Sequence, residues 1–195
     1  MYSVEEELIE SRNSIDRLLA DSQRLDAIRE IASLCVDALS RGNKILLVGN
    51  GGSAADAQHI AAEFVSRFNY DRPGLAAFAL TTDTSALTAI GNDYGFDQVF
   101  ARQVQAVGNS GDVLFGLSTS GTSSNILLAF KEAREKNIQT IGLCGEPGGK
   151  FDQYCDRVFR APASSTPKIQ EIHITVGHLI CGLVEASIFP KSDKS

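Results

Sequence analysis

The sequence predicts an α/β fold in which a five-stranded, mostly parallel sheet is covered by helices on both faces. Short, continuously apolar runs recur along the chain, and such runs are typical of strands buried on both faces of a parallel sheet. Segments with helical spacing of apolar residues lie between them, and this alternation favours parallel pairing through right-handed crossovers. The 195 residues, 43% of them hydrophobic, suffice for one such domain with an additional segment.

The additional segment is the first forty residues, which have the apolar spacing of two helices. In the first helix the apolar residues recur at helical steps, at Leu8, Ile15, Leu18 and Leu19. After a break near Asp21 the spacing resumes from Leu25 to Leu39, with apolar residues on two edges, and Gly42 ends the helix. We therefore expect a helical packing or oligomerisation segment at residues 1–41 and one α/β domain at residues 42–195.

The remaining elements follow in alternation. The expected strands are Lys44–Gly49, Ala76–Leu80, Val113–Leu117, Thr140–Leu143 and Arg157–Arg160. The expected helices are Ala54–Phe68, Thr84–Ile90, Phe96–Val107, Ser123–Lys136 and Lys168–Ile188. Because the carboxyl ends of parallel strands meet at one edge, the loops that follow the strands are where ligands of open α/β folds bind.

Charge and hydropathy exclude several classes of protein. The balance of 18 Lys and Arg against 24 Asp and Glu gives a net charge of −6, with no long basic run, which argues against a nucleic-acid partner or an anionic membrane surface. No apolar stretch approaches the roughly 18 residues that span a bilayer, and Met1–Glu10 is acidic where a signal peptide is basic. We expect a cytoplasmic protein with no membrane partner.

The four cysteines do not form a metal-binding or disulfide pattern. They are Cys35, Cys144, Cys155 and Cys181, and no two have C-x-x-C spacing. We expect reduced and mostly buried thiols.

The first glycine-rich loop, Gly49–Ser53, leaves a predicted strand and opens a helix. Its glycines allow close approach of a ligand, and Ser53 can cap a helix whose free N–H groups favour an anion. Gly49-x-Gly51-x-x-Ala54 fits a dinucleotide fingerprint, but Asp83 lies about 30 residues on, where the ribose-binding acid is expected after about 20. A phosphate-binding P-loop is excluded because no Gly-Lys-Ser/Thr is present.

A second loop, Leu117–Asn125, is rich in hydroxyls and also enters a helix. It combines hydroxyl donors, a glycine for close approach and a helix N-terminus, which together suit a phosphate group. One serine would suffice for a helix cap, so the surplus favours an anion site. In an acidic protein this loop predicts a small phosphorylated metabolite as ligand.

Polar groups on two helices complete the candidates. His59 and Glu63 are four residues apart and share a helix face, which suits a metal or a surface pair, and Arg67 could pair with Glu63. The last helix carries Gln170-Glu171-x-His173-x(4)-His178 in an apolar setting. Periodicity does not choose between Gln170 and Glu171 as the inward partner, and it favours a core or interface role for His173.

Four motifs occur together and in order: Asn50-Gly51-Gly52-Ser53, Gly91-Asn92-Asp93-Tyr94-Gly95, Ser118-Thr119-Ser120-Gly121-x-Ser123 and Gln170-Glu171-x-His173-x(4)-His178. With these motifs the chain resembles the sugar isomerase (SIS) domain family and, within it, the bacterial phosphoheptose isomerase family over essentially its whole length. The resemblance implies a SIS-type three-layer αβα sandwich. It also implies aldose–ketose isomerisation of sedoheptulose 7-phosphate to D-glycero-D-manno-heptose 7-phosphate, the first step of heptose synthesis for lipopolysaccharide or other surface glycans.

The resemblance further implies a homotetramer with active sites at subunit interfaces and one zinc ion per subunit. Its implied zinc ligands are His59, Glu63, Gln170 and His178, so it selects Gln170 over Glu171. Its implied catalytic base is Glu63 and its acid is His178. Its implied substrate contacts are Asn50, Gly51, Gly52, Ser53, Glu63, Asn92, Asp93, Ser118, Thr119, Ser120, Ser123 and Gln170. Whether zinc organises the site or takes part in the chemistry stays open at this point.

Two alternatives belong to other functional classes. One is a non-catalytic SIS-fold binding protein, such as the relative associated with the bacterial replication initiator, in which the resemblance implies neither Glu nor His at the positions of Glu63 and His178. The other is a different phosphosugar enzyme or sugar-phosphate-sensing regulator, which usually has a further domain. The presence of both residues in a chain of 195 favours the isomerase.

Overall fold

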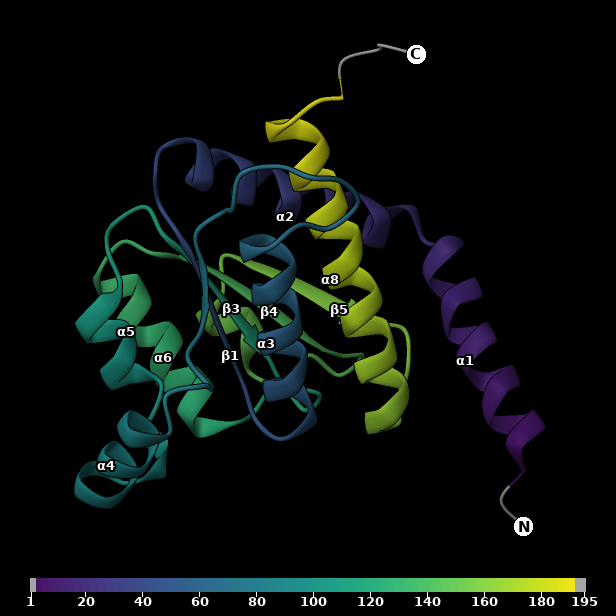
Figure 1. The fold of residues 1–195 in the computed structure, drawn as a ribbon. Coiled ribbons are helices and arrows are strands. Elements are labelled where there is room, and N and C mark those ends of the chain that lie inside the picture. The colour runs from purple at the N-terminus through teal and green to yellow at the C-terminus, as the bar shows by residue number, and fades with distance from the viewer. Residues whose placement is uncertain (1–2, 192–195) are drawn as a thin grey trace.

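A computed structural model describes residues 3–191 and contains the predicted sheet (Figure 1). Its strands are β1 (Ile45–Gly49), β2 (Ala77–Ala79), β3 (Val113–Leu117), β4 (Gln139–Gly145) and β5 (Arg157–Ala161). The order is β2-β1-β3-β4-β5, and every neighbouring pair is parallel. All five residues of β1 and of β3 are buried, which explains why these strands are continuous apolar runs.

The helices of the described chain are α1 (Val4–Leu19), α2 (Ser22–Ser40), α3 (Gly52–Val65), α4 (Thr84–Tyr94), α5 (Ala101–Val107), α6 (Ser124–Glu135), α7 (Phe151–Tyr154) and α8 (Thr166–Ile188), with a 3-10 turn η1 (Phe96–Gln98). The predicted helices are confirmed, but α4 continues to Tyr94 past its predicted end at Ile90, and there are three further differences. The short α7 was not predicted. The helix expected over Phe96–Val107 is divided into η1 and α5, since Val99 and Phe100 between them turn into the core.

The third difference is at the end of α3, which was expected to reach Phe68 but stops at Val65. The backbone N–H groups of Phe68 and Asn69 donate to the Glu185 carboxylate of α8, at 2.9 and 2.7 Å, instead of to carbonyls one turn back. A tertiary contact from a residue more than 100 positions away therefore ends the helix, and local propensity could not reveal it.

Two apolar cores lie on opposite faces of the sheet. In β1, Ile45 and Leu47 belong to the core formed with α2, α3 and α8, whereas Leu46 and Val48 belong to the core formed with α5 and α6. Figure 1 shows α3 and α8 side by side in front of the strands, and α5 and α6 together at the left, away from α3 and α8. The three-layer αβα architecture is thus confirmed.

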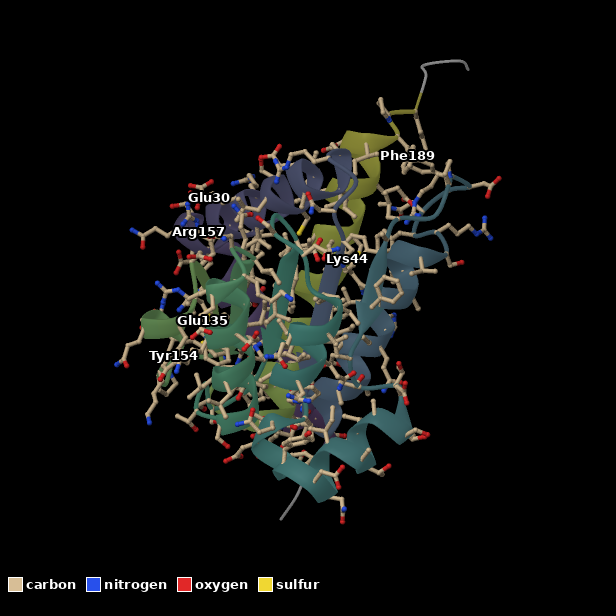
Figure 2. The ribbon with its side chains drawn as sticks, turned by 90° about the vertical axis from the view of Figure 1, so that its left-hand side faces the viewer. Glu30, Lys44, Glu135, Tyr154, Arg157 and Phe189 are labelled. Carbon is tan, nitrogen blue, oxygen red and sulfur yellow. The ribbon has the colours of Figure 1, made fainter. Side chains whose placement is uncertain are left out.

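The segment of α1 and α2 is attached unevenly. α2 packs in the core, and Figure 2 shows its Glu30 beside Arg157 of β5, with Glu30 Oε2 3.1 Å from Arg157 Nε. α1 contacts α8 and α2 but stands away from the sheet, and Leu8 and Leu19 of α1 are 66% and 70% exposed (Figure 1). The expected boundary after residue 41 stays a prediction.

α8 is the central helix of the larger core. Val176, Ile180 and Val184 are almost completely buried against α2 and α3. Within the described residues, it is also the one helix long and apolar enough to cross a membrane. The expectation that no segment reaches this limit is therefore wrong for α8, and its apolarity has another cause, since a helix packed on several sides is apolar on several sides.

The cysteines agree with the sequence expectation. All four are free thiols, and Cys35, Cys144 and Cys181 are buried while Cys155 is half-buried.

Candidate active site

The loops after β1 and β3 meet at the carboxyl edge of the sheet. Asn50 follows β1, and Asn125 lies in the first turn of α6, which follows the loop after β3. Their side-chain amides form two reciprocal hydrogen bonds of 3.0 and 2.9 Å. These bonds connect two loops that are 75 residues apart in sequence. The structure thereby brings together the two loops that the sequence singled out.

The hydroxyls of residues 118–123, here called the serine loop, form a connected cluster. Ser118 Oγ lies 3.0 Å from Ser123 Oγ and 3.4 Å from Ser120 Oγ, and Ser120 Oγ lies 2.9 Å from Thr122 Oγ1. Ser118 is buried, whereas Ser120 and Thr122 are exposed and available to a ligand. Ser123 is the N-cap residue of α6, so the cluster lies at the positive end of a helix.

Glycines give the serine loop its shape. Gly121 has φ +64°, a left-handed conformation that favours glycine, and a Cβ there would collide with the carbonyl oxygen of Gly148. The segment after β4 packs against the loop, and the Lys150 backbone N–H donates to the Gly121 carbonyl at 2.9 Å. The loop is therefore held by backbone contacts in addition to the contacts among its hydroxyls.

The start of α3 forms the second part of the edge. Gly51 has φ +55°, and a Cβ on Gly52 would lie 2.6 Å from the Gln170 amide nitrogen, so Gly52 leaves room for that side chain. Gln170 Nε2 lies 3.5 Å from Ser53 Oγ. Glu171 is instead exposed, with a carboxylate oxygen 2.9 Å from Lys168 Nζ. Of the two residues that periodicity left open, Gln170 faces the loop.

His59, Glu63 and His178 form a compact set here called the His–Glu–His group. Their ligand atoms all lie within 4.8 Å of one another. His59 Nε2 lies 3.1 Å from Glu63 Oε1 and 3.1 Å from His178 Nε2. The first two residues lie one turn apart on α3 and the third on α8, so the group exists only because these helices pack side by side.

The donor set of this group fits a metal ion such as zinc. Tetrahedral zinc at about 2.0–2.1 Å from its ligands places those ligands about 3.3 Å apart, close to the two separations of 3.1 Å. Imidazole nitrogens and a carboxylate are ordinary zinc ligands. The same three groups also comprise a carboxylate and imidazoles that can accept and donate protons.

Gln170 is not part of the His–Glu–His group within one chain. It precedes His178 by eight residues on α8, which corresponds to about 12 Å along the helix axis. Its contacts are at Gly52 and Ser53, at the other end of α3. Its predicted substrate contact suits this position, and its predicted role as metal ligand stays a prediction.

Asn92 and Asp93 lie on a separate element. Both are exposed near the end of α4, where Asn92 Nδ2 donates to Asp93 Oδ1 at 2.8 Å. The following turn η1 is tied to the carboxyl edge by a hydrogen bond from Ser124 Oγ to Asp97. Their contact with substrate stays a prediction.

Two further ionisable groups lie near the site. Burial raises the pKa of Asp56 above its usual value, and the nearby His59 offsets part of that rise; one of its carboxylate oxygens is buried without a hydrogen-bond partner among the described residues. His173 is completely buried, as the core interpretation predicts, with Nε2 3.2 Å from the Cys144 carbonyl oxygen. Burial lowers the pKa of His173 to about 4.

Sequence reasoning missed Arg72 and Glu185, a buried pair beside the His–Glu–His group. Arg72 Nε lies 3.1 Å from Glu185 Oε1, and their side chains are 2% and 0% exposed. Burial alone would raise the pKa of Glu185, but hydrogen bonds from two backbone N–H groups and from Arg72 outweigh it and hold that pKa below its usual value. A Glu within the apolar end of the last helix was the available signal. Arg67, considered as the partner of Glu63, has no ion pair with it among the described residues, where Glu63 pairs with His59.

Comparison with known proteins gives a consistent result. A family model described as SIS domain matches residues 10–145. The phosphoheptose isomerase of Burkholderia pseudomallei (strain K96243) is 56% identical over 184 residues, covering 94% of this chain and 93% of that protein. The phosphoheptose isomerase of Aneurinibacillus thermoaerophilus is 56% identical over 179 residues, covering 92% and 90%.

Solved structures agree with these relatives. Phosphoheptose isomerase GmhA from Neisseria gonorrhoeae superposes with a TM-score of 0.88 at 44% identity, covering 94% of this chain and 97% of that one. A phosphoheptose isomerase from Francisella tularensis superposes with a TM-score of 0.86 at 36% identity, covering 94% and 98%. The likeness therefore extends over nearly the full length of each chain.

Proposed function

This chain belongs to the SIS domain family and, within it, to the phosphoheptose isomerases, and from this premise we propose that it interconverts sedoheptulose 7-phosphate and D-glycero-D-manno-heptose 7-phosphate. The product would enter heptose synthesis for lipopolysaccharide or other surface glycans. The observation that carries the proposal is the His–Glu–His group, in which a carboxylate and two imidazoles meet.

The reaction needs a base that moves a carbon-bound proton. Conversion of the ketose to the aldose removes a proton from C1, passes through an enediolate and returns a proton to C2. We assign this transfer to the Glu63 carboxylate, since a positioned general base contributes about 10²–10⁴-fold. His178 would donate a proton to O2, the ketose carbonyl oxygen, and accept the proton of the O1 hydroxyl as the carbonyl moves to C1. Its place within hydrogen-bonding reach of His59 orients its ring.

The serine loop would hold the phosphate end of the sugar. Its exposed hydroxyls and the N-terminus of α6 offer donors without a cationic side chain, which suits a small phosphate ester in a protein of net charge −6. Binding energy from this remote group would orient the chain of the open sugar over a Glu63 carboxylate. Because Glu63 follows Gly52 by 11 residues, about 16 Å along α3, that carboxylate would come from a second copy of the chain. Asn50, Gly51, Gly52, Ser53 and Gln170 would contact the sugar from the start of α3, and Asn92 and Asp93 from α4.

Zinc is the proposed cofactor, at one ion per subunit. His59, Glu63 and His178 would hold it, with Gln170 as the fourth ligand. Because Gln170 lies about 12 Å along α8 from His178, its role as a ligand requires that the amide come from a second copy of the chain. When bound, zinc would polarise the sugar carbonyl and stabilise negative charge on the enediolate oxygens.

A homotetramer in the cytoplasm is the proposed state of the protein. The support is the apolar stripe of α1, where Val4, Leu8, Ile15 and Leu19 are exposed within about 60° of one helix face. Residues 1–41 would then be the assembly segment and residues 42–195 the SIS domain. Light scattering of the wild type against Leu8→Glu/Leu19→Glu tests this, since a tetramer that persists unchanged in the variant would contradict the role of α1.

The enzyme is favoured over a non-catalytic SIS-fold binding protein because Glu63 and His178 are both present and lie in one group. The test is incubation of the purified protein with sedoheptulose 7-phosphate, followed by NMR detection of the aldose. Aldose at a rate set by enzyme concentration is expected, and its absence would refute the proposal. Elemental analysis of protein prepared without a histidine tag tests zinc separately, with about one ion per chain in wild type and a loss in His59→Ala.

A further inference from the structure

We propose that the buried ion pair of Arg72 and Glu185 positions the two halves of the His–Glu–His group relative to each other. Two residues of that group lie on α3 and one on α8, so their separation depends on how the two helices are joined at this end. We call the ion pair of Arg72 and Glu185, with its hydrogen bonds to the end of α3, the joint between the two helices. Its consequence for turnover rests on the proposed function, whereas its consequence for metal affinity does not.

Glu185 provides the α8 side of the joint. It follows His178 by seven residues, which is about two turns and places both on nearly the same face of α8. Its carboxylate accepts hydrogen bonds from the backbone N–H groups of Phe68 and Asn69 at 2.9 and 2.7 Å and from Arg72 Nε at 3.1 Å. A completely buried carboxylate with three such donors has one fixed orientation.

Arg72 provides the α3 side. Its Nη2 donates to the Glu63 carbonyl oxygen at 2.8 Å, and its Nη1 donates to the Phe64 carbonyl oxygen at 2.7 Å. These carbonyls lie in the last turn of α3, where no further helical N–H is available to them. The planar guanidinium thus binds the backbone of a proposed catalytic residue with one edge and Glu185 with another.

The same joint also places an aromatic ring. Phe68, whose N–H is held by Glu185, has its ring centroid 5.5 Å from that of His178. The His178 ring therefore lies against both the Phe68 ring and the His59 ring, whose centroid is 4.9 Å away. Loosening the joint is expected to free both the end of α3 and the ring of His178.

A second pair on the sheet provides a matched control. Lys44 Nζ lies 2.7 Å from Asp112 Oδ2, with side chains 17% and 1% exposed. Lys44 directly precedes β1 and Asp112 directly precedes β3, so this pair lies at the amino edge of the sheet (Lys44 is labelled in Figure 2). It shares the buried cation–carboxylate chemistry but touches neither α3 nor α8.

The experiment compares Arg72→Met/Glu185→Leu with Lys44→Met/Asp112→Leu. Apolar replacement of both partners avoids leaving one buried charge unpaired, so both proteins are expected to fold. Zinc affinity is measured by competition with a chromogenic chelator, and kcat and KM with the phosphorylated ketose. For the Arg72 and Glu185 variant we expect zinc affinity at least tenfold weaker and kcat at least tenfold lower, with KM within threefold. The control is expected to keep both within threefold of wild type.

Equal zinc affinity and equal kcat in the two variants would overturn the proposal, as would parallel losses in both. Arg72→Lys gives a second test, because it keeps the charge but loses the fork that reaches two α3 carbonyls; an intermediate loss supports the proposal even if the double variant does not fold, and none overturns it. If the wild type binds zinc but has no isomerase activity, the proposed function is refuted. Weaker zinc binding in the Arg72 and Glu185 variant would then still support the positioning role of the ion pair. A wild type with neither zinc binding nor turnover would overturn both.

Discussion

The serine loop and the His–Glu–His group are built in opposite ways. The loop is one continuous stretch whose backbone is held by glycines and by the segment after β4, and its hydroxyls come from residues adjacent in sequence. The His–Glu–His group joins two helices and depends on the buried ion pair between Glu185 of α8 and Arg72 of the segment after α3. A phosphate-binding site can be formed by one segment of the chain, because several hydrogen-bond donors bind the phosphate together. Proton transfer instead needs a few atoms held to within fractions of an ångström.

The largest effect is expected from variants that remove a proton-transfer group of the His–Glu–His group and leave the serine loop intact. Glu63→Gln and His178→Gln should each lower kcat by about 10³-fold, because each removes a proton-transfer group, while KM stays within a few-fold. Steady-state kinetics with the phosphorylated ketose measures this, and circular dichroism checks the fold. Near-wild-type turnover in both variants would contradict the assigned roles.

The next largest effect is expected from variants that remove hydroxyls of the serine loop and leave the His–Glu–His group intact. Ser120→Ala combined with Ser123→Ala removes two hydroxyls, and hydrogen bonds to a charged group contribute about 1.5 kcal/mol or more each, so KM should rise about 100-fold with kcat nearly unchanged. Ser187→Ala, which removes an exposed hydroxyl near the end of α8, is the control for simple loss of a hydroxyl. An unchanged KM in the double variant would remove the serine loop from substrate binding.

His173, the third histidine, extends the comparison to a buried group with no proposed role in the reaction. His173 has an ordinary pKa of 6.5, lowered to about 4 in the folded protein by burial. Between these values the unfolded chain binds a proton that the folded protein does not, so the free energy of unfolding falls as pH falls from 6.5 toward 4. At pH 5 the loss is about 2 kcal/mol.

Urea unfolding at pH 7 and pH 5 measures this loss. His173→Gln, which cannot titrate, should lose less stability between the two pH values than the wild type. The window lies above the range in which the lowered pKa values of Glu185 and Asp112 contribute. An identical pH dependence in the two proteins would show that His173 is not the group responsible.

The smallest effect is expected from loss of the hydrogen bonds that connect the loop after β1 with the start of α6. Asn125→Ala leaves the Asn50 amide without its two hydrogen bonds, at a net cost of about 1 kcal/mol. KM is expected to rise about threefold to tenfold, because Asn50 is a proposed substrate contact that loses its orientation. Asn125→Asp retains one of the two bonds, so its KM should lie between those of Asn125→Ala and the wild type. A wild-type KM in Asn125→Ala would show that the amide pair has a purely structural role.

The sequence predicted those parts of the fold that depend on local pattern. Apolar runs located all five strands, since burial on both faces leaves β1 and β3 no polar positions. The serine loop was predictable for the same reason, because its residues are neighbours in the chain. The spacing of His59 and Glu63 placed them on one helix face, but their meeting with His178 depends on helix packing that periodicity does not encode.

What the sequence could not predict has a common physical cause. The end of α3 at Val65, the buried pair of Arg72 and Glu185 and the separation of Gln170 from His178 all depend on where α8 lies against α3. Each involves residues about 110 positions apart or the pitch of a whole helix. The distinction between Gln170 and Glu171 came from resemblance, and the structure gives its physical counterpart in the room left by Gly52.

Isomerisation in deuterium oxide tests the central claim most directly. If the Glu63 carboxylate moves a proton through an enediolate, that proton can exchange with solvent before it reaches C2. Aldose kept in equilibrium with the ketose must therefore gain solvent deuterium at C2, and its formation must be lost in Glu63→Gln. NMR of the product measures both. Deuterium at C2 in the wild type with about 10³-fold slower formation in the variant is the predicted result; aldose without deuterium, or the same rate in Glu63→Gln, would contradict the account.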